Sequence, residues 1–157
     1  VTEWDIREDG RIIGVTEELS AQAIYELGKK LDPFIIASGT RMGHVHLSVK
    51  NSREASSFYQ ESLGLEDKFT IPHASWIASG DYHHHLAVNE WGGKNLARRE
   101  KGLIGLAYYV VEVENKDFLV NLLSQAQDQQ GQLQWISSSE FSIIDKDGIV
   151  TRVRVGN

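Results

Sequence analysis

The chain has 157 residues, 41% of them hydrophobic, with a formal net charge of −6 and no cysteine. This length predicts one domain, or two small repeats around a shared core, and the absence of cysteine removes disulfides, thiolate ligands and cysteine nucleophiles. The negative charge, without any Lys/Arg stripe, argues against a nucleic-acid partner. No apolar run is long enough to cross a bilayer and no targeting pattern is present, so we expect no membrane partner and a cytoplasmic location.

The first 41 residues predict a connector with one helix. Residues 1 to 15 are typical of a short strand-like entry that includes Trp4 and Ile12. A helix is expected over residues 17 to 31, since Thr16 is a suitable N-cap and apolar residues recur at helical spacing until Asp32-Pro33. Because the chain begins with Val1 rather than Met, we expect it to be a fragment of a longer protein.

Residues 42 to 92 predict a βαβββ unit. A strand is expected over 44–49, and the capping pair Asn51-Ser52 opens an amphipathic helix that ends at Gly64. Three short strands should follow, over 68–71, 74–78 and 83–88.

A second unit with the same pattern is expected over residues 103 to 156. Val113 matches Val49 at an offset of 64 residues, and Leu123 matches Tyr59 at the same offset. Its elements are a strand over 106–113, a helix over 116–130 and strands over 132–137, 140–144 and 149–155, with a tight turn at Asp145-Lys146-Asp147-Gly148. The predicted domain is therefore α+β, with paired βαβββ modules that form a curved mixed sheet around a central cleft.

Five of the six histidines lie in two of these strands. Strand alternation places His44 and His46 on one face, and it places His83 and His85 on the face opposite His84, Leu86 and Val88. His44 and His85 are then expected to meet over the sheet, while His84 packs on the helix side. Neutral imidazole suits zinc, iron and nickel alike, so the pattern indicates a divalent metal site. Hydrogen-bonded structural histidines or a solvent-facing edge strand are the alternatives.

Paired βαβββ units resemble the vicinal oxygen chelate superfamily, which includes glyoxalases, bleomycin resistance proteins and extradiol dioxygenases. His44 opens an H-x-x-L-x-V strand, and the turn at residues 145–148 is similar to a D-P-D-G turn with Lys for Pro. More narrowly, Gly43-His44-Val45-His46-Leu47 with Tyr82-His83-His84-His85 and Asn89-Glu90-Trp91 resembles the C-terminal half of two-domain bacterial catechol 2,3-dioxygenases.

This resemblance implies a metal-dependent ring-cleavage enzyme of aromatic catabolism, with two histidines and one carboxylate on iron(II). It assigns His44 and His85 as metal ligands and His46 or His83 as the acid/base. Trp76, Tyr108 and Arg152 are the candidates for substrate binding. The implied substrates are a catechol-type aromatic and dioxygen. The implied macromolecular partner is a second copy or an N-terminal half, and other metals, or no metal in this fragment, are alternatives to iron.

The second unit departs from the family pattern. Tyr108 lies where a histidine is expected and Arg152 where a carboxylate is expected. At an effective dielectric constant near 20, charges of +1 and +2 about 5 Å apart repel by several kcal/mol, so metal affinity in this half should be weakened. Arg152 is expected to bind an anionic group, to pair with Asp81, Glu90 or Glu112, or to be a solvated edge charge.

Two functional hypotheses follow from these residues. The first is the ring-cleavage dioxygenase described above, or the C-terminal half of one. The second is a metal-free or degenerate glyoxalase-fold domain that binds or supports a catalytic N-terminal half. A third reading, a glyoxalase-like isomerase, needs carboxylate ligands that the sequence does not place.

Overall fold

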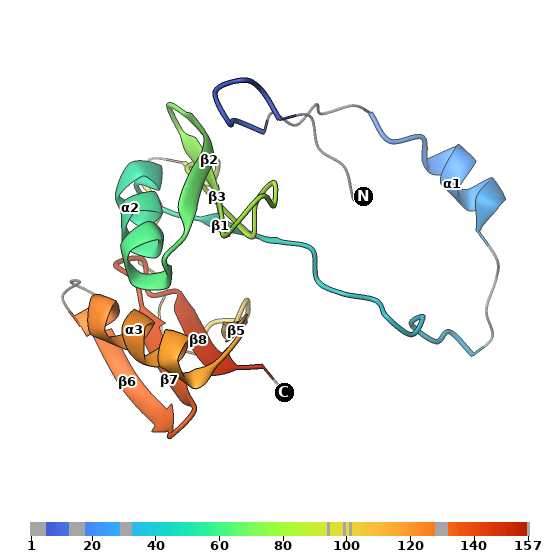
Figure 1. Ribbon diagram of the computed structural model, residues 1–157. Helices are drawn as coiled ribbons and strands as arrows, with labels where there is room; N and C mark the ends of the chain where they lie inside the picture. The colour runs from blue at the N-terminus through green and yellow to red at the C-terminus, as the bar shows by residue number, and fades with distance from the viewer. Residues whose placement is uncertain are drawn as a thin grey trace.

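A computed structural model describes residues 6–12, 18–28, 33–93, 95–98, 100, 102–127 and 132–156 of the chain. Two modules form the body of the molecule, and the short N-terminal helix lies apart from them (Figure 1). None of the helices within these ranges is long and apolar enough to cross a membrane.

The N-terminal helix α1 (Ala21–Leu27) is shorter than predicted. The side-chain oxygen of Ser20 accepts a hydrogen bond from the backbone N of Ala23, so the helix begins there. Thr16 and residues 29–32 lie outside the described ranges, as do Trp4 and the end of the strand-like entry. Within that entry Ile6 and Ile12 form an isolated antiparallel bridge. None of the α1 side chains is buried, so this helix gains no stability from packing against the modules.

The first module contains β1 (Val45–Ser48), α2 (Ser52–Leu63), β2 (Glu66–Ile71), β3 (Ala74–Ala78) and β4 (Leu86–Asn89). Its sheet has the order β1-β4-β3-β2, with β1 parallel to β4 and the other pairs antiparallel. The Asn51 side chain caps α2 by accepting from the backbone N atoms of Arg53 and Glu54. Gly64 ends the helix in the left-handed region at φ 64°, which costs glycine little.

The second module repeats this topology with β5 (Tyr109–Val113), α3 (Lys116–Gln127), β6 (Gln132–Ser137), β7 (Glu140–Ile144) and β8 (Val150–Val155). Its sheet order is β5-β8-β7-β6, again with one parallel pair, β5 and β8. The predicted α+β fold with two βαβββ modules is confirmed. The strands form two separate four-stranded sheets rather than one continuous sheet. The division of the chain at residue 41 stays a prediction.

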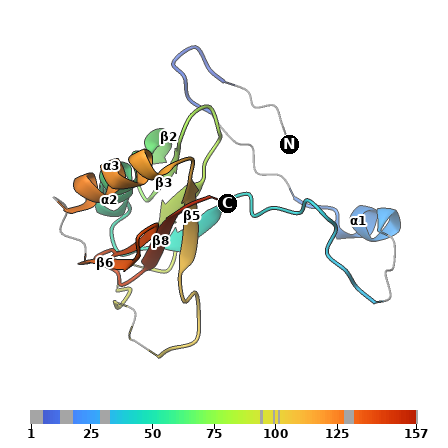
Figure 2. The ribbon, with the colours of Figure 1, turned by 60° about the horizontal axis from the view of Figure 1, so that its bottom comes forward.

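One hydrophobic core joins the modules. Helices α2 and α3 lie on the same side of the two sheets (Figure 2), and side chains from both modules belong to one buried cluster. The matched pairs of the repeat are all in it: Val49 and Val113, Tyr59 and Leu123. The apolar residues that repeat between the modules are therefore those that face the helices and form the common core.

The tight turn before β8 holds the two modules together. The hydroxyl of Tyr59 on α2 donates to Asp145 Oδ2 at 2.7 Å, and the backbone N of Ile149 donates to Asp145 Oδ1 at 2.8 Å. The next carboxylate, Asp147, accepts from the backbone N of Lys50 at 3.2 Å, two residues after the end of β1. Burial raises the pKa of Asp145 above its usual range. The second module is thereby fixed against the end of the strand that carries His46.

Candidate metal and substrate site

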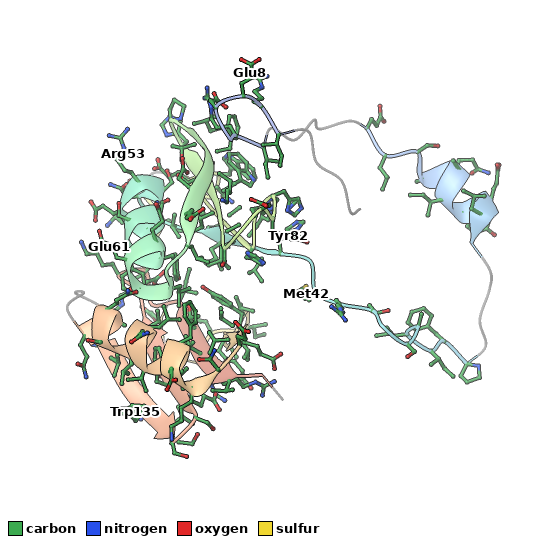
Figure 3. All side chains as sticks on the ribbon, in the orientation of Figure 1. Glu8, Met42, Arg53, Glu61, Tyr82 and Trp135 are labelled. Atoms are coloured by element: carbon green, nitrogen blue, oxygen red, sulfur yellow. The ribbon has the colours of Figure 1, made fainter. Side chains whose placement is uncertain are left out.

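Three imidazoles lie together at the start of the first sheet. A ring nitrogen from each of His44, His83 and His84 lies within 4.8 Å of a ring nitrogen of the other two. Because β1 and β4 are parallel neighbours with Val45 opposite Leu86, the residues just before the two strands come side by side. Figure 3 shows Tyr82 on this loop, on the side where the segment with Met42 enters β1. We call His44, His83, His84 and the adjoining His46 the histidine cluster.

His46 connects the three imidazoles to an aromatic wall. Its Nε2 lies 3.2 Å from Nε2 of His84, and its ring centroid lies 6.5 Å from that of Trp91. Trp91 is in turn 6.5 Å from Trp76, and Trp76 is 5.4 Å from Phe69. The register pairs His46 with Ala87 and Ala87 with Trp76, so His46 and Trp76 share the sheet face that α2 does not cover. The predicted substrate-binding residue Trp76 is therefore on the same face as His46.

The environment of the cluster favours neutral imidazoles. Burial, followed by repulsion from His44 and His83, lowers the pKa of His84 to about 3. Burial is also the leading cause that lowers the pKa of His46 and His83, with His44 as a further cause. A neutral ring keeps a lone pair for a metal ion, so the lowered pKa values of His46, His83 and His84 favour the protonation state that coordination requires.

The donor set fits a divalent transition metal. Three neutral imidazoles suit zinc, iron(II) or nickel, and three protein ligands leave coordination positions for other groups. With bonds of about 2.0 to 2.1 Å, two donors on one ion are at most about 4.2 Å apart, so the rings need only a small contraction around it. The group that the described residues form consists of imidazoles, whereas the resemblance implies one carboxylate among the ligands.

The structure corrects the predicted orientation of two histidines. His84 was expected beside Leu86 and Val88 on the helix side, but its ring lies 4.3 Å from that of His44. His85 lies outside the group of three, stacks on Tyr82 at 4.7 Å, and accepts a hydrogen bond from the backbone N of Ser79 through Nδ1. The alternation failed because β4 begins only at Leu86, so residues 83–85 follow the course of a loop and not of a strand.

Tyr108 and Arg152 of the second module contact each other. The Arg152 guanidinium carbon lies 3.9 Å from the centroid of the Tyr108 ring, and Nη1 lies 3.6 Å from Oε1 of Glu140. The expected pairing of Arg152 with Asp81, Glu90 or Glu112 is wrong. Glu112 instead accepts from Arg154, and Glu90 accepts from Ser52 and contacts His73. The two positions that depart from the family pattern are therefore engaged with each other and with a carboxylate.

A pocket of about 340 Å³ opens where the two modules meet. We call it the seam pocket. Its lining comes from β1, from the segment that links the modules and from the turn before β8, and it includes His46, Ser48, Leu96, Leu103, Leu106, Asp147 and Ile149. Since both modules contribute residues, the predicted central cleft has a counterpart here.

Sequence reasoning missed several residues of the site. Trp91 follows β4 and was noted only as part of the resemblance, yet it links His46 to Trp76. The pocket residues Leu96 and Leu103 lie in a segment outside the helices and strands, where no periodic pattern points to them. Leu106 was expected in a strand over 106–113, but β5 begins only at Tyr109, so Leu106 belongs to the same linking segment. The run of apolar residues in a short linking segment is the signal that could have marked them.

Comparison with known proteins supports a relation by sequence and by fold. No family model matches the chain. The chain is 27% identical over 128 residues to a catechol-2,3-dioxygenase of Bacillus subtilis (strain 168), a match that covers 78% of this chain and 45% of the relative. The chain thus spans less than half the length of the curated relative that it matches.

Two solved structures have the same arrangement of elements. A glyoxalase/dioxygenase from Nostoc punctiforme has a TM-score of 0.61 at 14% identity, covering 79% of this chain and 97% of that one. A glyoxylase/bleomycin resistance protein/dioxygenase domain from Frankia sp. EAN1pec has a TM-score of 0.59 at 17% identity, covering 76% and 100%. The resemblance predicted from sequence is confirmed: the chain has the glyoxalase/bleomycin resistance protein/dioxygenase fold, that of the vicinal oxygen chelate superfamily.

Proposed function

We propose that the chain is a metal-dependent extradiol dioxygenase acting on catechol-type aromatics, or the C-terminal half of one. The observation that carries this proposal is the approach of three imidazole donors within 4.8 Å beside an aromatic wall. The similarity to a catechol-2,3-dioxygenase supports the proposal, because a dioxygenase of that kind needs a metal site beside an aromatic substrate.

In this proposal His44, His83 and His84 hold the metal. We assign the third position to His84 rather than to His85, because the ring nitrogens of His85 lie outside the group of three. A bound iron(II) would supply a Lewis acid with open positions for a catecholate and dioxygen, and other divalent metals remain alternatives.

The remaining residues bind and orient the substrate. His46 is neutral and borders the three imidazoles, so its ring is placed to accept a proton from a catechol hydroxyl. Trp76 and Trp91 offer apolar surfaces on the same side of the sheet, against which an aromatic ring would pack. Because the substrate would lie between these groups, its hydroxyls face the histidines and its ring faces the tryptophans.

The test is ring cleavage by the protein purified without a histidine tag and loaded with iron(II) under anaerobic conditions. Addition of catechol and then air should consume oxygen and produce a yellow product that absorbs in the visible range. His44→Ala should abolish both signals. His73→Ala is the matched control, because His73 is an exposed histidine that contacts Glu90 and lies outside the cluster. Equal oxygen uptake by the His44→Ala protein and the wild type would refute the assignment.

A second candidate function rests on the second module. The positions of the expected ligands are occupied by Tyr108 and Arg152, which contact each other and Glu140. Under this alternative the chain is a metal-free binding or structural domain that supports a catalytic N-terminal half, or a second copy, in the cytoplasm. Metal analysis separates the two, since the alternative predicts no metal in the untagged protein and no cleavage after iron loading.

A further inference from the structure

Glu90 lies between the aromatic wall and the start of α2. It follows β4 directly and precedes Trp91, whose ring lies between those of His46 and Trp76. The side chain of Glu90 is only 20% exposed, so neighbouring groups cover most of it. The proposed function uses Trp91 as a packing surface and gives no role to Glu90.

The carboxylate of Glu90 is held by the first residue of α2. Its Oε1 accepts from the backbone N and from Oγ of Ser52, each at 2.9 Å. These two bonds, followed by the contact with the His73 imidazole, lower the pKa of Glu90 to about 2. The His73 ring is 65% exposed and contacts the other oxygen, Oε2, at 3.1 Å. Ser52 is therefore the main anchor, and loss of the His73 side chain would leave its two bonds in place.

The main chain of Glu90 opens the turn that carries Trp91. Its backbone N donates to the carbonyl of His73 at 3.0 Å, and its own carbonyl accepts from the backbone N of Gly93 at 3.0 Å. The second bond closes a turn in which Trp91 is the residue after Glu90. The backbone N of Trp91 also donates to Asn89 Oδ1 at 3.2 Å. Because a turn sets the direction of the side chains at its corner, the anchor on Glu90 also orients the indole.

Packing alone holds the indole of Trp91 weakly. Trp91 is 63% exposed, and the ring centroids of His46 and Trp76 each lie 6.5 Å away. Both distances are near the outer end of the range of roughly 4.5 to 7 Å over which aromatic rings interact. The position of the indole therefore depends on the backbone that carries it.

We propose that Glu90 is a positioning residue, whose bonds to Ser52 hold the indole of Trp91 beside the histidine cluster. The consequence for turnover rests on the proposed function, whereas the placement of the indole does not. Loss of the anchor should raise KM for catechol by about three- to tenfold, the effect of losing one aromatic contact, and should change kcat less.

Fluorine NMR of the full chain labelled with fluorotryptophan measures the placement directly. Trp91→Phe assigns the Trp91 resonance, and Trp135 on β6 of the second module is the internal reference. In Glu90→Ala the Trp91 resonance should move towards that of free fluorotryptophan, while the Trp135 resonance stays in place. In Glu90→Gln it should stay near its wild-type position, because the amide oxygen still accepts from Ser52.

Glu54→Ala is the matched control. Glu54 is another glutamate in the first turn of α2, but it contacts Lys146 and not the turn after β4. This variant should leave the Trp91 resonance and KM unchanged, which separates the anchoring of Trp91 from a general weakening of the helix. Ser52→Ala removes one of the two donors and should move the resonance less than Glu90→Ala, so it repeats the test if Glu90→Ala does not fold.

A Trp91 resonance that moves in neither Glu90→Ala nor Ser52→Ala would overturn the proposal. Equal movement in Glu54→Ala or in Glu90→Gln would overturn it as well. A moved resonance in Glu90→Ala, with no catechol cleavage by the iron-loaded wild type, would refute the ring-cleavage function and leave the positioning role of Glu90 supported.

Discussion

The two modules have the same topology but carry different chemistry on the sheet faces that the helices leave uncovered. In the first module this face presents His46 and Trp76, next to the imidazoles of His44 and His84. In the second it presents Arg152 and Arg154 of β8, which pair with Glu140 and Glu112. The helix-side faces, in contrast, pack into one common core. A fold can therefore repeat through its buried positions while the exposed face of each copy takes a separate role.

The largest expected effect comes from removing one proposed metal ligand of the first module. If His84 is a ligand as proposed, His84→Ala should weaken binding of zinc or iron(II) by more than the roughly 10- to 100-fold that loss of a residue supporting a ligand costs. His85→Ala is the matched variant in the same loop and should have a much smaller effect, since His85 lies outside the group of three. Competition with a chelator of known affinity measures both. A larger loss of metal affinity in His85→Ala than in His84→Ala would indicate that His85 is the ligand instead.

Loss of the Tyr59 hydroxyl, which lies between the two modules, should lower the stability of the fold. Tyr59→Phe removes the donor to Asp145 Oδ2 and leaves a buried carboxylate oxygen unpaired, which should lower the free energy of unfolding by about 1 to 3 kcal/mol. Tyr25→Phe on α1 is the control, because Tyr25 is 81% exposed. Urea denaturation measures the difference. Equal midpoints for the Tyr59 variant and the wild type would show that this hydrogen bond does not hold the modules together.

The histidine cluster should make the metal-free protein sensitive to acid. The pKa of His84 in the folded state is about 3, below its usual 6.5, so the unfolded state binds the proton more readily. The contribution of His84 to stability is complete above pH 6.5 and is lost as the pH falls from 6.5 towards 3. Urea midpoints across this range should fall less steeply in His84→Gln than in the wild type. Equal slopes of urea midpoint against pH in the variant and the wild type would contradict the lowered pKa of His84.

The smallest expected effect belongs to the charge network of the second module. Arg152→Leu removes a half-buried ion pair with Glu140 and a contact with the exposed Tyr108 ring, each worth about 1 kcal/mol. The free energy of unfolding should therefore change by less than about 2 kcal/mol, as measured by urea denaturation. A larger loss of stability would show that this network has a structural role.

The sequence predicted the fold well because buried faces leave a periodic trace. Alternation and helical spacing located every strand and helix of the two modules to within a few residues, and the 64-residue offset identified the repeat. The site was harder to predict, since His83, His84 and His85 lie in a loop where side-chain direction has no fixed period. The partner of Arg152 was missed because Glu140 lies on the neighbouring strand β7, and only the register of β7 and β8 brings the two together.

The central claim is that the metal site lies in the first module and draws no ligand from the second. Elemental analysis of untagged, iron-loaded protein after gel filtration tests it with two double variants. The account predicts one divalent ion per chain in the wild type and in Tyr108→Phe/Arg152→Leu, and loss of the ion in His44→Ala/His84→Ala. Retention of the ion by the histidine double variant, or its loss from the Tyr108/Arg152 double variant, would contradict the claim.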